Sequence, residues 1–152
     1  RKFVNPGWFI AAPICAVGTY LIATFAVEGL VYLFHIDRIK YLDTYAKAGY
    51  GMWFGVLLVA VQPGIIEELA FRGVILTSLQ RVLGNTEALV VSALMFAILH
   101  LSIPSIPHLF LMGVVLGWFR LRSGSILPGM LLHFTHNLLV VLAEQHGSIF
   151  PW

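Results

Sequence analysis

The stretch from Met52 to Leu79 is almost entirely apolar, yet two adjacent carboxylates and an arginine lie inside it, at Glu67, Glu68 and Arg72. A charged side chain near the centre of a bilayer costs roughly 2.5–3.5 kcal/mol on insertion scales. Three such residues in one hydrophobic segment therefore need partners or a function. Ionisable residues within membrane segments are typical of sites that bind or move protons, so this stretch predicts proton chemistry inside a membrane.

The composition agrees with a membrane protein. Hydrophobic residues make up 59% of the chain and charged residues 11%, whereas soluble domains carry about 25% charged residues. The apolar segment from Pro6 to Phe34 exceeds a signal-peptide core of about 7–15 residues, so we expect a spanning helix that is retained. Because Arg1 is not a start methionine, we expect a trimmed chain or one part of a longer protein. The net charge of +2 gives no argument for nucleic acid.

The chain is predicted to be all-α, a polytopic membrane helix bundle of about five transmembrane helices with a polar site buried among them. Residues 1–152 are expected to form a single membrane domain, in which residues 1–50 supply an N-terminal helix and a polar connection. His35–Lys47 is either a loop or a surface helix. The apolar segments are about Gly7–Phe34, Gly51–Leu79 (interrupted by Pro63-Gly64), Glu87–Leu101, Pro107–Leu121 and Ser125–Ala143.

Polar groups on three of these segments lie at similar depth. At 1.5 Å per residue, Glu67 is about 21 Å from Arg81, and His100 about 20 Å from Glu87 at the same side. Counted from Gly124, also at that side, His133 and Asn137 come at about 14 and 20 Å. Agreement in depth is what one shared site requires.

Spacing suggests how these groups pair. Glu68 and Arg72 are four residues apart, so they share a helix face and can form an ion pair. Glu67 points about 100° away, so it must either find another polar partner or stay protonated. A carboxyl group that can exchange a proton in this setting suits a general base. His133 and Asn137 also share a face, and burying them without partners is costly.

Other polar residues are less decisive. His136 lies three residues after His133, and either joins that face or bonds a backbone carbonyl. Glu28 marks a segment end or faces the bundle. His35, His108 and His146 lie near segment ends, where water satisfies them.

Three motifs, in this order, resemble the CPBP family of intramembrane proteases, which includes type II CAAX prenyl endopeptidases and bacteriocin-processing or immunity proteins. They are Glu67-Glu68-Leu69-Ala70-Phe71-Arg72, then Phe96 with His100, then His133 with Asn137. The resemblance covers about residues 63–142. It implies an intramembrane endopeptidase that cleaves near the C-terminal end of a membrane-associated or lipidated substrate.

The resemblance also implies roles. Glu67 activates a water with help from His100, His133 and Asn137 stabilise the oxyanion, and Glu68 and Arg72 support the site. Amide hydrolysis needs such a base, an oxyanion donor and an acid for the leaving amine. Cofactors are left open: no cofactor is certain, and if zinc is used, Glu67, His100 and His133 are its expected ligands.

The expected partners are a membrane-associated peptide or protein substrate and the lipid bilayer; the oligomeric state is open. We expect an integral membrane protein of a bacterial cytoplasmic membrane, since the compact core lacks long appended regions. The alternative function is a catalytically silent family member that acts by binding, in peptide-toxin immunity or as a scaffold. A transporter is disfavoured, because no inverted repeat is seen.

Overall fold

The computed structural model describes residues 3–35 and 40–146, and every element in these ranges is helical, which confirms the all-α prediction. In chain order the elements are α1 (Gly7–Phe34), α2 (Tyr41–Lys47), α3 (Met52–Gly55), η1 (Val56–Val61), α4 (Gln62–Glu68), η2 (Leu69–Ile75), α5 (Leu76–Leu79), α6 (Asn85–Ile98), η3 (Ile103–Ser105), α7 (Ile106–Ser123) and α8 (Leu127–Gln145).

Within the described ranges, four helices are long and apolar enough to cross a membrane: Gly7–Phe34, Met52–Leu79, Ile103–Ser123 and Leu127–Gln145. The remaining apolar segment forms α6, which at 14 residues is about 21 Å long, short of a bilayer core of about 30 Å. The expected five helices are present, but only four meet the length of a span. Many large apolar side chains on their surfaces are exposed, Ile10, Ile14 and Phe25 among them, as lipid-facing surfaces require. The chain is an integral membrane protein.

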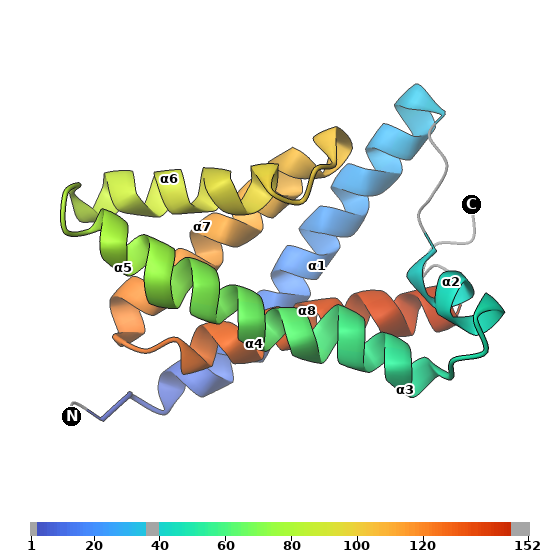
Figure 1. Ribbon diagram of the computed structural model, residues 1–152, viewed down its shortest axis with the longest axis horizontal. Helices are drawn as coiled ribbons and strands as arrows, with labels where there is room; N and C mark the ends of the chain where they lie inside the picture. Colours follow the sequence, from blue (N-terminus) through green and yellow to red (C-terminus); the bar gives the residue numbers. More distant parts are fainter. Residues whose placement is uncertain (1–2, 36–39, 147–152) are drawn as a thin grey trace.

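The segment Met52–Leu79 is a single unbroken helix (Figure 1), in which α-helical and π-helical stretches alternate. It has two π-helical stretches, η1 and η2, and the N–H of Gln62 bonds the carbonyl of Leu57, five residues earlier. Pro63 follows directly, at the start of α4. The backbone at Val61 and at Gln62 keeps right-handed helical angles, so the interruption expected at Pro63-Gly64 is a change of register, not a break. Such π-turns are frequent at functional sites.

Helix α8 lies at the centre of the bundle. It packs against α1 on one side and against η1 and α4 on another, while α6 packs along α7. In Figure 1 the green helix from α3 to α5 and the red α8 run along the long axis of the molecule, and α6 lies beside α7. The polar motifs on α4, α6 and α8 thereby come to neighbouring positions.

Two glycines permit the close approach of these helices. A Cβ on Gly64 would lie 3.2 Å from both Cβ and N of Phe134, so α4 contacts α8 backbone to backbone. A Cβ on Gly113 would lie 2.9 Å from Cα of Ala93, which sets the distance between α6 and α7.

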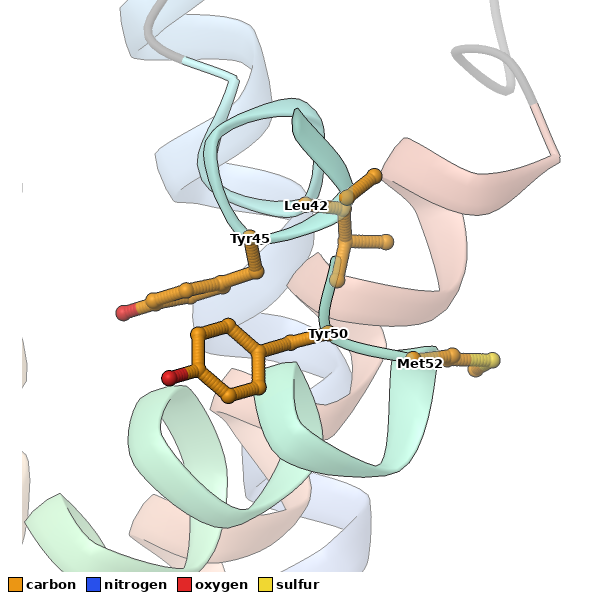
Figure 2. A pocket seen from close by; sticks show the side chains of 6 residues that line it. Leu42, Tyr45, Tyr50 and Met52 are labelled. Atoms are coloured by element: carbon orange, nitrogen blue, oxygen red, sulfur yellow. The ribbon is translucent and has the colours of Figure 1, made fainter. Parts of the chain in front are cut away.

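The polar stretch His35–Lys47 contains the short helix α2, so the surface-helix alternative is correct for Tyr41–Lys47; residues 36–39 lie outside the described ones. Glu144 of α8 accepts the N–H of Leu42 at 2.7 Å and fixes the start of α2. A shallow pocket of about 120 Å³ lies between α2 and α3, and Figure 2 shows the Tyr45 and Tyr50 rings on one side of it. Trp53 is exposed beside it, as is typical of aromatic residues at a membrane interface.

We predict that Gly113→Ala destabilises the protein by about 1–3 kcal/mol, because the new methyl group overpacks the contact with Ala93. Gly18→Ala is the matched control, since a Cβ there meets nothing within 4 Å and alanine favours a helix. Thermal unfolding of the two variants in detergent measures the difference. Equal melting temperatures would show that α6 and α7 do not depend on this close contact.

Candidate functional site

Glu68 and Arg72 form the predicted ion pair, and both side chains are buried. Nη1 of Arg72 donates to Oε1 of Glu68 at 2.8 Å, and each side chain is only 1% exposed. Nη2 of Arg72 also donates to the carbonyl of Gly113 on α7 at 3.1 Å. The guanidinium lies 4.5 Å from the centre of the Phe96 ring on α6. One arginine therefore connects three helices.

His133 on α8 is oriented by the same carboxylate. Its Nδ1 lies 3.0 Å from Oε1 of Glu68. Because Glu68 is paired with an always-charged arginine and an ionised carboxylate only accepts, Nδ1 of His133 is the donor. In the neutral ring, Nε2 is then an unprotonated acceptor.

His100 follows the C-terminal end of α6 and is held in the same way by a different group. Its Nδ1 lies 2.7 Å from the carbonyl oxygen of Phe96. A carbonyl oxygen can only accept, so Nδ1 carries the proton and Nε2 of the neutral ring is an acceptor. The ring also packs edge-on against Phe96 with centroids 4.7 Å apart, which the four-residue spacing allows.

Glu67 lies opposite both imidazoles. Its Oε2 is 3.9 Å from Nε2 of His133 and 4.0 Å from Nε2 of His100, and this buried oxygen has no hydrogen-bond partner among the residues that the structure describes. The separations are too long for a direct hydrogen bond and suit one bridging water. The carboxylate and both ring nitrogens are acceptors, so the group that fits among them is a donor such as water.

The same three side chains are of the types that bind zinc. Among the described residues, however, no group of three or more His, Cys, Asp or Glu side chains has an arrangement that could hold a metal ion. The zinc set that the sequence left open stays a prediction, and we derive no step through a metal.

Asn137 has a partner that the sequence did not indicate. Its Nδ2 donates to the carbonyl oxygen of Val59 on η1 at 2.9 Å. The structure therefore brings Glu67, His100 and His133 together, and it attaches Asn137 to a neighbouring helix backbone. The oxyanion role expected for Asn137 stays a prediction.

His136 takes neither of the partners considered from the sequence. It is buried, and its Nδ1 lies 2.9 Å from Oγ1 of Thr19 on α1, whose hydroxyl donates to the carbonyl of Ala16. His136 is therefore the donor to Thr19 and connects α8 to α1. Thr19 has no motif around it, so no sequence signal could have identified this contact. Glu28 is half-buried near the C-terminal end of α1.

The fold and this geometry define a helical membrane protein with a carboxylate–imidazole site inside the bundle. A family model described as type II CAAX prenyl endopeptidase Rce1-like matches residues 49–139. The match covers more than half of the chain and all three motifs, and the chain belongs to this family. It starts earlier than the expected 63–142 and so includes the whole helix from α3 to α5, whereas α1 lies outside it. Comparison with curated proteins and with solved structures gave no match.

We predict that Arg72→Met destabilises the protein by about 3–5 kcal/mol, because it leaves the buried carboxylate of Glu68 without its cation. The double variant Glu68→Gln with Arg72→Met should recover part of this loss, because no buried charge is then unpaired. Arg122→Met, at an exposed position near the end of α7, is the matched control. Thermal unfolding of the purified variants tests this, and a loss no larger than that of the control would contradict it.

Proposed function

We propose that the protein is an intramembrane endopeptidase that hydrolyses a peptide bond near the C-terminal end of a membrane-associated or lipidated substrate, using a water activated by Glu67. The observation that carries the proposal is the unpartnered Oε2 of Glu67 facing two imidazole nitrogens at 3.9 and 4.0 Å. Membership of a prenyl endopeptidase family supports the reaction class.

The chemistry starts with the water. It donates one hydrogen bond to Glu67 and one to Nε2 of His100, so that its lone pair is free for the substrate carbonyl. Glu67 takes a proton as the new C–O bond forms and returns it to the nitrogen of the leaving amine as the C–N bond breaks. Acid–base catalysis of this kind contributes typically 10²–10⁴-fold.

His133 is the group suited to the oxyanion. The carboxylate of Glu68 accepts from its Nδ1 and orients the ring, as a carboxylate does behind a catalytic imidazole. When the ring takes up a second proton from water at this edge, Nε2–H donates to the developing negative charge. Glu68 and Arg72 act through His133 and are positioning residues. The proposal assigns no step to Asn137.

The substrate and location complete the proposal. Glu67 and His100 are 30% and 32% exposed, whereas His133 is 4% exposed. In this proposal the partly exposed side of Glu67 and His100 receives the polypeptide and water. The residues that support them, Glu68, Arg72 and His133, are buried. The apolar helices indicate an integral membrane protein, and we propose a bacterial cytoplasmic membrane as its location.

Glu67→Gln is predicted to lower peptide cleavage by roughly 10²–10⁴-fold, because an amide cannot accept the proton of water. The measurement is mass spectrometry of peptides that end in a prenylated cysteine and three further residues, incubated with protein in liposomes. Glu87→Gln, at an exposed position at the start of α6, should cleave normally. Undiminished cleavage by Glu67→Gln would refute the mechanism. A biological phenotype that survives this change, without cleavage by either protein, would favour the binding alternative.

The two histidines are predicted to respond differently. His100→Ala should lower kcat with a small effect on stability, because its ring is partly exposed and bonds only its own helix. His133→Ala should lower kcat and also destabilise the protein by about 1–3 kcal/mol, because a buried hydrogen bond to Glu68 is lost. Steady-state kinetics and thermal unfolding of each variant separate the effects. Equal stability losses would show that His133 is not part of the Glu68 network.

A further inference from the structure

Three features meet at the start of α4, and together they interrupt the regular backbone hydrogen bonds to the carbonyls of η1. In η1 the N–H of Gln62 bonds the carbonyl of Leu57, five residues back. Pro63 comes next and has no N–H. In the α-helical register that resumes there, residue 63 would donate to the carbonyl of Val59. Pro63 therefore cannot supply the α-helical donor to that carbonyl.

The Val59 carbonyl is bonded from another helix. Nδ2 of Asn137 on α8 donates to the oxygen of Val59 at 2.9 Å. In a membrane every backbone polar group must find a partner inside the protein, because lipid offers none. Asn137 is half-buried, and this bond stabilises the packing of α8 on η1 even when no substrate is bound.

The neighbouring contacts make this bond part of an ordered alignment. Helix Met52–Leu79 and α8 run antiparallel: Val59 contacts Asn137, a Cβ on Gly64 would touch Phe134, and Glu68 contacts His133. Pro63 lies four residues before Glu67, and Asn137 lies four residues after His133. The bond between Val59 and Asn137 thus fixes the axial register of α4 against α8. This register determines the position of Glu67 relative to His133.

We infer that Asn137 is a positioning residue. Its amide donates to the Val59 carbonyl, which lacks the α-helical donor because residue 63 is proline, and this hydrogen bond (called the fastening below) places Glu67 opposite His133. The effect on catalysis rests on the proposed function, whereas the fastening itself does not. The inference differs from the oxyanion role, in which Asn137 acts on the substrate and owes nothing to Pro63.

A double-mutant cycle on the full-length chain tests it, with Asn137→Ala, Pro63→Ala and both together. We expect Asn137→Ala to lower the melting temperature by about 2–4 °C, as loss of one hydrogen bond in a protein of this size predicts. It should also lower kcat by roughly 10–100-fold at similar KM, since small misplacements of catalytic groups have such effects. In the Pro63→Ala background, where residue 63 can donate to Val59, both losses should shrink.

Two matched controls isolate the pairing. Pro13→Ala removes a proline from the interior of α1, and the effect of Asn137→Ala should be unchanged in that background. Thr135→Val removes a hydroxyl on α8 that bonds only the carbonyl of Leu131 on its own helix, and it should show no coupling to Pro63→Ala.

The outcomes separate the alternatives. Equal melting-temperature losses in both backgrounds would overturn the fastening. Coupling in melting temperature with an unrelieved loss of kcat would overturn the positioning role and favour direct action on the substrate. Wild-type protein that cleaves no tested peptide would count against the proposed function, and the melting temperatures would still decide the fastening. If Pro63→Ala does not accumulate, Asn137→Leu decides it: this variant has a similar size, has no donor and should melt below the wild type, and a wild-type melting temperature would overturn the inference.

Discussion

The buried ion pair between Glu68 and Arg72 is the interaction on which the rest of the site depends. A carboxylate alone in this setting would be costly, and removal of one partner of a buried pair is strongly destabilising. Here each partner has further contacts. Glu68 accepts from His133 on α8, and Arg72 donates to Gly113 on α7 and lies over Phe96 on α6. The pair therefore joins the helices that carry all three motifs, and the orientation of His133 follows from it.

The two adjacent glutamates have different surroundings because consecutive residues point about 100° apart on a helix. Glu68 faces the sealed interior, where Arg72 and His133 use its Oε1. Glu67 faces the Nε2 atoms of His133 and His100. The protons of these two rings are on Nδ1, which donates to Glu68 in His133 and to the carbonyl of Phe96 in His100. The carboxylate of Glu68 thus fixes the tautomer of His133. The carboxylate of Glu67 faces the Nε2 lone pair of that tautomer, with room for a bridging water between them. The supporting bonds and the reactive edge are chemically distinct, although the residues are neighbours in sequence.

The sequence was sufficient for the helical class, for the pairing of Glu68 with Arg72 and for bringing Glu67 near His100 and His133, because these follow from helix periodicity and from depth in a membrane. It could not provide the partner of Asn137. That contact depends on a carbonyl to which Pro63 cannot donate and on the approach of α4 to α8 at Gly64, and a hydrogen bond to a backbone oxygen leaves no mark on residue type. The bond from His136 to Thr19 was hidden for the same reason: α1 has no periodic polar face. The predicted segment Glu87–Leu101 ends three residues after α6 does, because the apolar run continues past Ile98 into the turn that holds His100.

The position of His100 in that turn explains why one edge of a polar site inside a membrane bundle is left uncovered by protein. Helix α6 ends at Ile98, about 21 Å from its start, so its C-terminal end lies at the level of Glu67 and does not continue past it. A longer α6 would cover this edge of the site with hydrocarbon side chains. The early end instead leaves His100 and Glu67 each about one-third exposed, while Phe96, one turn earlier, seals the arginine beneath them. In the proposed mechanism, a short helix that ends at the level of Glu67 serves both needs of the carboxylate, since it leaves water access on one side and a closed ion-pair network on the other.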